Sequence, residues 1–215
     1  MTPNRSAAVL RPLREDHLGA STFIEKGWHL IAVGEYPEAE AAVTRALEMA
    51  PSDATARSLL GWAQMLQGRY REAMRVLSEL LREDPRHAMA RANLGYVCLR
   101  LGHMGSAQQH LAQASQQSRD AKAALYANFY LGLYFIEEAL WGDAERAFGR
   151  ALELAPNFIE AYYELGRAQL REGRREDARS TWKAGHSANR FNVWGKRCVE
   201  ALRLDDMGKD PPSYS

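Results

Sequence analysis

The sequence GWHLIAVGEYPEA, residues 27–39, returns as GWAQMLQGRYREA at residues 61–73, a step of 34 residues. Both stretches place a Trp directly after the first Gly, and a second Gly, a Tyr and an Ala follow at matching places. A structural unit is therefore repeated along the chain. The recurring Trp raises a separate question, since the packing of two helices against each other does not require it.

The repeat continues through most of the chain. With the first Gly as position 8 of a 34-residue unit, it recurs as Gly27, Gly61, Gly95, Gly132 and Gly166. Position 20 is always small, as Ala39, Ala73, Ala107, Ala144 and Ala178. Position 24 is always larger and apolar, as Val43, Leu77, Leu111, Phe148 and Trp182. A proline closes three units, at Pro51, Pro85 and Pro156.

This pattern resembles the tetratricopeptide repeat (TPR) family, whose signature runs W-x2-L-G-x2-Y, then Ala, an aromatic residue and Pro. The resemblance implies an all-α fold, a right-handed α-solenoid of five helical hairpins with a C-terminal capping helix. The expected divisions are an N-terminal segment 1–19, repeats 20–53, 54–87, 88–124, 125–158 and 159–192, a capping helix 193–207 and a flexible tail 208–215.

The physical pattern agrees with that fold. Each unit divides at a residue where a helix can end in a left-handed conformation, namely Gly34, Gly68, Gly102, Gly173 or, in the fourth unit, Ala139. Apolar residues on either side recur at spacings of three and four, which predicts two helices per unit. Small residues at positions 8 and 20 let the two helices approach closely. Stacking of the hairpins then buries the apolar surface that a single hairpin leaves exposed.

The third unit departs from the pattern. Arg119 stands where the closing Pro is expected, and three extra residues lie around Gln116. The insertion predicts either a longer second helix or a widened turn.

The C-terminal end is predicted to cap the solenoid. Asn192 is suited to begin a helix whose apolar residues Trp194, Cys198 and Leu202 share one face. The tail from Gly208 contains Gly, Pro and Ser without periodicity, so it is expected to be flexible.

Composition excludes several classes of protein. With 28 basic and 27 acidic residues, the net charge of +1 gives no broad field for nucleic acid or an anionic membrane. Two cysteines a hundred positions apart, Cys98 and Cys198, predict a reducing compartment. No apolar run is long enough for a signal-peptide core or a membrane span, so a soluble cytoplasmic protein is expected.

The first helix of each unit has a second apolar face at positions 2, 5, 9, 12 and 13, which lines the concave groove in the family. The predicted groove residues are Ile24, Trp28, Ile31, Trp62, Met65, Asn93, Tyr96, Tyr126, Phe129, Leu133, Tyr163 and Arg167.

Three interpretations of the Trp at position 9 are open. The aromatic side chains can pack on the neighbouring hairpin and seal the solenoid. They can instead form an apolar trough for a partner segment, since contiguous apolar surface commonly marks a binding site. The chain's own start, with Val9, Leu10, Leu13 and Leu18, is a third occupant of the groove.

The residue types at the groove positions exclude one class of partner. TPR co-chaperones hold the acidic C-termini of heat-shock proteins with Lys, Arg and Asn at defined positions. Those positions hold Ile24, Trp28, Leu59, Met89 and Asn93. Only Asn93 matches, and a carboxylate would lose its hydration without a cation, so that ligand class is not expected. The apolar groove instead suits the hydrophobic face of an amphipathic helix. Two roles of Asn93 are open: it can hydrogen-bond the backbone of an extended or helical peptide, or it can be solvated or paired within the chain.

No chemistry is indicated. The six histidines form no metal-binding pattern, and the glycines of the repeat are explained by packing and turns rather than by a phosphate loop. We therefore expect no cofactor, no metal and no enzymatic activity. The predicted function is an adaptor or scaffold that binds an apolar or amphipathic protein segment, as an assembly factor or regulatory subunit. A structural protein that assembles with itself is the alternative.

Overall fold

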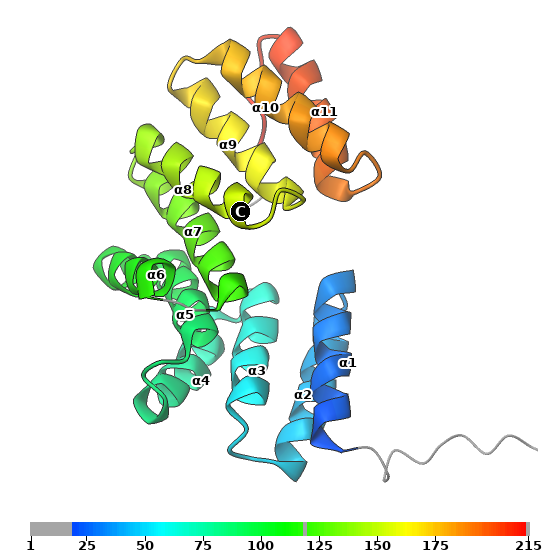
Figure 1. The fold of residues 1–215 in the computed structure, drawn as a ribbon, viewed down its shortest axis with the longest axis vertical. Coiled ribbons are helices and arrows are strands. Elements are labelled where there is room, and N and C mark those ends of the chain that lie inside the picture. The colour runs from blue at the N-terminus through cyan, green and yellow to red at the C-terminus, as the bar shows by residue number, and fades with distance from the viewer. Residues whose placement is uncertain (1–18, 118–119, 214–215) are drawn as a thin grey trace, which may run out of the picture.

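Eleven helices form in the chain, for which the computed structural model describes residues 19–117 and 120–213. No strand occurs within these ranges, and the all-α prediction is confirmed (Figure 1). The helices are α1 (Ala20–Val33), α2 (Tyr36–Met49), α3 (Ala54–Leu66), α4 (Tyr70–Glu83), α5 (Ala88–Arg100), α6 (Met104–Gln117), α7 (Ala121–Glu137), α8 (Trp141–Leu154), α9 (Ile159–Arg171), α10 (Arg175–Ala188) and α11 (Val193–Asp206).

Consecutive helices pair into five hairpins, from α1 with α2 to α9 with α10, and α11 packs against α9 and α10. Four hairpins turn at a glycine with positive φ, such as Gly34 at 89°, whose N–H donates to the Ile31 carbonyl at 3.1 Å. The fourth hairpin turns at Ala139, with φ 56°. The turns expected from the sequence therefore lie where the helices end.

The repeated Gly and the residue at position 24 meet inside each hairpin. A Cβ atom on Gly95 would lie 2.6 Å from Leu111 Cγ and 3.2 Å from the Leu111 backbone nitrogen. Leu111 is fully buried, as is Ala107 at position 20. The missing side chain at position 8 thus creates the space that the apolar residue of the partner helix fills.

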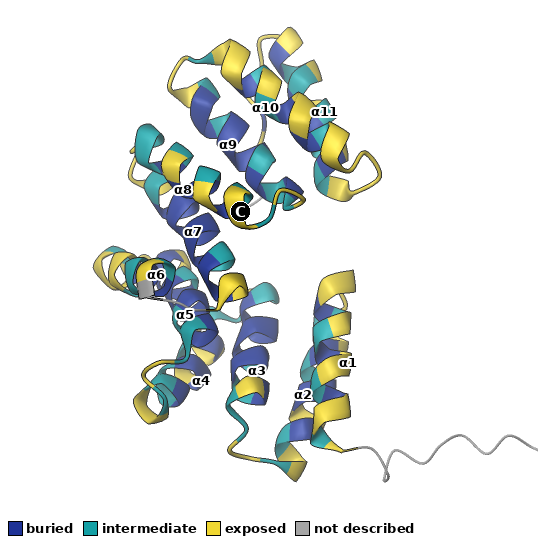
Figure 2. Ribbon diagram, in the orientation of Figure 1, coloured by how far each residue is buried: buried dark blue, intermediate teal, exposed yellow. Residues whose placement is uncertain are grey.

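The stack of hairpins is curved, with α5 and α6 at the middle of the curve and α1 and α11 at its two ends (Figure 1). Odd-numbered helices contact one another from α1 to α9, whereas no even-numbered helices contact each other in the described chain. The odd-numbered helices therefore form a close inner layer, and the even-numbered helices fan out around it. Figure 2 shows the inner helices α3, α5 and α7 buried along most of their length.

The three extra residues lengthen α7 rather than α6. Helix α7 has 17 residues, against 13 in α5, and it begins at Ala121 instead of Leu125. Asp120 caps it, because its carboxylate accepts hydrogen bonds from the backbone N–H groups of Lys122 and Ala123 at 2.9 and 3.2 Å. The insertion therefore adds a turn at the start of the fourth hairpin, which neither predicted alternative described. Residues 118–119 lie outside the described ranges.

The C-terminal tail packs on α9 instead of extending into solvent. Pro211 is buried, and the Tyr163 hydroxyl donates a hydrogen bond to the Pro212 carbonyl at 2.7 Å. Arg171 pairs with Asp210 at 3.2 Å (Nη2 to Oδ2). The structure thus places residues 210–213 against α9, in the segment for which the sequence predicts a flexible tail. Helix α11 begins at the cap Asn192, as predicted.

Candidate binding groove

The inner helices enclose one large hollow of about 790 Å³. Every odd-numbered helix contributes to its lining, from Trp28 of α1 to Trp194 of α11. The remaining lining residues are His29, Ile31, Ala32, Tyr36, Trp62, Met65, Leu66, Tyr70, Tyr96, Arg100, Lys122, Tyr126, Phe129, Tyr130, Leu133, Phe158 and Glu160. We refer to this hollow and its lining as the groove.

Most of the predicted groove residues meet here. They are Trp28, Ile31, Trp62, Met65, Tyr96, Tyr126, Phe129 and Leu133, which the chain brings from α1, α3, α5 and α7. Ile24, Asn93, Tyr163 and Arg167 are not part of the lining. Contact of any of these residues with a partner stays a prediction.

The aromatic rings of successive repeats pack edge to face. Trp62 lies between Trp28 and Tyr126, with ring centroids 5.2 and 5.1 Å away and interplanar angles of 67° and 69°. Only 5% of Trp62 is exposed, whereas Trp28 and Tyr126 are half-buried. Trp62 therefore seals neighbouring repeats and lines the groove at the same time, so the two interpretations of the repeated Trp do not exclude each other.

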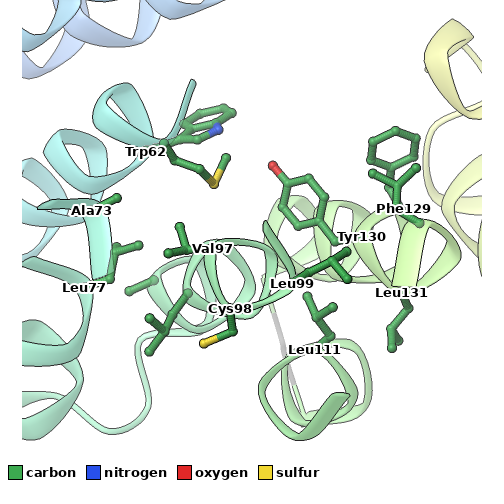
Figure 3. Packing of buried hydrophobic residues seen from close by; sticks show 14 of the residues in the cluster. Trp62, Ala73, Leu77, Val97, Cys98, Leu99, Leu111, Phe129, Tyr130 and Leu131 are labelled. Atoms are coloured by element: carbon green, nitrogen blue, oxygen red, sulfur yellow. The ribbon is translucent and has the colours of Figure 1, made fainter. Parts of the chain in front are cut away.

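Trp62 also brings a polar group into the groove wall. Its buried Nε1 is directed toward the hydroxyl end of Tyr130 (Figure 3), with which it interacts. Burial raises the pKa of Tyr96 to about 12 and that of Tyr126 to about 12. These phenols remain neutral near pH 7, and the groove wall is aromatic with hydroxyl and N–H groups at its edges.

Asn93 does not line the groove, where the sequence predicted it. Its side chain is completely buried, and neither amide atom has a hydrogen-bond partner in the described chain. Helix α5 is packed between α3 and α7, which leaves Tyr96 and Arg100 as its contributions to the groove. The expected hydrogen bond from Asn93 to a partner backbone is therefore not available in this structure.

Tyr163 and Arg167 lie beneath the C-terminal tail. Tyr163 is 1% exposed and bonded to Pro212, and Arg167 donates to the Ser213 hydroxyl at 3.3 Å. Arg167 also pairs with the buried Glu164. The concave positions of the fifth repeat are thus covered by the chain's own terminal residues.

Two cationic residues that line the groove were not predicted from the sequence. Lys122 Nζ lies 4.0 Å from the ring centroid of Trp28, and Arg100 Cζ lies 5.6 Å from that of Tyr70. Lys122 enters the groove because the added turn of α7 carries it toward α1. The sequence signal that would have shown this is the capping residue Asp120 followed by an alanine-rich run.

Glu160 is the one carboxyl group among the described residues of the lining. Its pKa is raised to about 8, mainly by burial and also by the nearby Glu164 carboxyl, while Arg197 opposes the shift. Part of its surface nevertheless remains accessible from the groove. At pH 7 this side chain is therefore mostly protonated, and it supplies a neutral donor and acceptor rather than a negative charge.

The described residues give no sign of a catalytic or metal centre. No group of three His, Cys, Asp or Glu side chains that could hold a metal ion occurs among them. Cys98 and Cys198 are buried, and burial raises the pKa of both thiols, which disfavours the reactive thiolate.

Comparison with known proteins identifies the family. A family model for the tetratricopeptide repeat matches residues 30–92, 65–130 and 135–191. The chain belongs to the tetratricopeptide repeat family. TPR proteins are generally interaction modules without enzymatic activity, and they bind protein or peptide partners. No curated protein sequence matches the chain.

Solved TPR structures have the same fold. TTC0263 from Thermus thermophilus is 22% identical, with a TM-score of 0.72 over 86% of this chain and 100% of that chain. PilF from Pseudomonas aeruginosa is 21% identical, with a TM-score of 0.67 over 88% and 84%. YrrB, described as a TPR protein with an unusual peptide-binding site, is 24% identical, with a TM-score of 0.55 over 86% and 92%. At these identities the likeness concerns the fold alone.

In the described ranges, every helix is too short or too polar to cross a bilayer.

Proposed function

We propose that this TPR protein binds the apolar face of an amphipathic segment of a partner protein in its groove, as an assembly factor or regulatory subunit without enzymatic activity of its own. The observation that carries the proposal is the groove of about 790 Å³, to which all odd-numbered helices contribute side chains, most of them aromatic or aliphatic. The peptide-binding site named for YrrB supports it by analogy of fold.

The physical case rests on partly exposed rings. Trp28, Tyr96, Tyr126 and Trp194 line the groove without being fully buried, so each can still bury surface against a partner. Aromatic side chains of this kind supply most of the binding energy of many interfaces. Their rings are already held by contacts with buried aromatic residues, which lowers the entropy lost on binding.

A neutral peptide tests this function. The probe is an acetylated, amidated peptide of about five helical turns, with Leu at positions i, i+3, i+4 and i+7 of its repeat and Gln and Ala elsewhere. We expect it to bind the full chain in isothermal titration calorimetry. The Trp28→Ala variant should weaken binding by roughly thirtyfold, the usual loss of a central aromatic anchor.

Phe191→Ala is the matched control, because Phe191 is 76% exposed and lies outside the groove lining. Its affinity should equal that of the wild type. Absence of binding, or equal losses in the two variants, would exclude the groove as the site.

Two other occupants would give different results. The N-terminal segment with Val9, Leu10, Leu13 and Leu18 lies outside the described residues. If deletion of residues 1–18 were needed for the peptide to bind, the chain's own start would be the occupant. Self-assembly through the groove would instead appear as a mass in light scattering that rises with concentration and falls when the peptide is added.

A further inference from the structure

The groove contains two cations without a carboxylate partner. Arg100 and Lys122 are exposed lining residues, and neither forms an ion pair within the described part of the chain. Each lies over an aromatic ring instead, Lys122 on Trp28 and Arg100 near Tyr70. The rings hold the charges in place and leave their polar ends available to an anion.

The fifth repeat shows what such a cation binds on this concave face. Arg171 is at position 13 of its repeat, five residues after Gly166, and Arg100 is five residues after Gly95. The two arginines are therefore equivalent by the repeat. Arg171 pairs with Asp210 of the tail at 3.2 Å, and the tail is held further by the hydrogen bond from Tyr163. Arg100 forms no such ion pair in the described chain, although Glu137 lines a smaller pocket together with it.

Glu160 does not supply the missing negative charge. Burial among the groove residues raises its pKa to about 8, with Glu164 adding to the shift and Arg197 opposing it. The hydroxyl groups of Tyr96, Tyr126 and Tyr130 face the same carboxyl and stay neutral, since burial raises the pKa of each. The described lining is therefore net positive near pH 7.

We infer that the partner segment carries Asp or Glu side chains beside its apolar face, and that these pair with Arg100 and Lys122. The inference rests on the proposed function and gives the partner its chemistry: an acidic, amphipathic segment rather than a neutral or basic one. It concerns side-chain carboxylates and needs no free C-terminus, because the tail pairs with Arg171 through the side chain of Asp210.

The test compares three acetylated, amidated peptides with the same leucine pattern and with Gln, Glu or Lys on the polar face. Calorimetric titration of the full chain should give the order Glu, Gln, Lys from tightest to weakest. The Glu peptide should bind about five- to tenfold more tightly than the Gln peptide, as expected for two partly exposed ion pairs. This advantage should shrink as salt is raised, because screening acts on exposed charges.

The double variant Arg100→Gln, Lys122→Gln should lose the preference for the Glu peptide over the Gln peptide. Arg71→Gln with Lys183→Gln is the control, because it removes the same charge from exposed residues of α4 and α10 and should keep the preference. The ratio of the affinities for the Glu and Gln peptides is compared between variants. Any difference in helix content between the two peptides then cancels.

The outcomes separate the two proposals. If no peptide binds, the proposed function fails and the inference fails with it. If the Gln and Glu peptides bind equally, if the Lys peptide binds best, or if the double variant keeps the preference for the Glu peptide, the inference alone is overturned. Circular dichroism of each variant confirms that it is folded before its affinity is compared.

Discussion

The indole of Trp62 and the phenol ring of Tyr126 meet edge to face, with centroids 5.1 Å apart at an interplanar angle of 69°. The two residues belong to α3 and α7, so the contact reaches past the intervening hairpin helix α5 along the inner layer. It joins the second repeat to the fourth, and with Trp28 on the other side of Trp62 it extends to the first repeat. The inner aromatic residues therefore hold the curvature of the solenoid.

Replacing Trp62 with Ala should destabilise the protein by about 3–5 kcal/mol, because a buried aromatic side chain would be lost and its cavity cannot collapse between fixed rings. Urea denaturation measures the loss. Phe191→Ala, at a 76% exposed position, should change the free energy of unfolding by less than about 0.5 kcal/mol. A loss below about 1 kcal/mol for Trp62→Ala would show that Trp62 is exposed rather than sealing the repeats.

Two glycine substitutions should have opposite effects. Gly95→Ala should destabilise by about 1–3 kcal/mol, since the new methyl group would meet Leu111, including its backbone nitrogen. Gly149→Ala should stabilise by about 0.5–1 kcal/mol, because Gly149 lies inside α8 with nothing within 4 Å of its Cβ position. Thermal unfolding of both variants checks the signs. A stabilising Gly95→Ala would contradict the close approach of α5 and α6.

Ala139→Gly should stabilise the fourth hairpin by about 0.5–1 kcal/mol. Ala139 has φ 56°, where a side chain costs about 1–2 kcal/mol, and glycine removes that cost while adding entropy to the unfolded chain. The reverse change, Gly173→Ala at φ 85°, should be destabilising. Chemical denaturation of the pair gives the comparison, and equal effects in the two variants would contradict the strain at Ala139.

Stability should depend on pH through Glu160. Its pKa is about 8 in the folded protein and near 4.5 when unfolded, so the folded state binds more protons between these values. The free energy of unfolding should therefore be highest below about pH 4.5 from this group and should fall as the pH rises to about 8. Glu160→Gln should flatten that part of the profile. Identical urea profiles for wild type and variant between about pH 5 and about pH 8 would mean that the carboxyl is not desolvated.

The sequence by itself determined the hairpins. Their helices, turns and close contacts depend on residues near one another in the chain, so each corresponds to residue types at a fixed spacing. Examples are Gly95 with Leu111 inside a hairpin and Gly34 where α1 ends. The inner face could be predicted for the same reason, because helical periodicity assigned Trp28, Trp62 and Tyr96 to one side of their helices.

Only the tertiary structure decided how that face is used. Burial of Trp62, the approach of Lys122 to Trp28, and the raised pKa of Glu160 depend on the sum of the rotations between hairpins and on an added turn at the start of α7. The docking of Asp210 and Pro212 on α9 depends on the path of the chain after α11. These contacts join residues far apart in sequence, and no periodic pattern records them, because each depends on one surface meeting another in three dimensions.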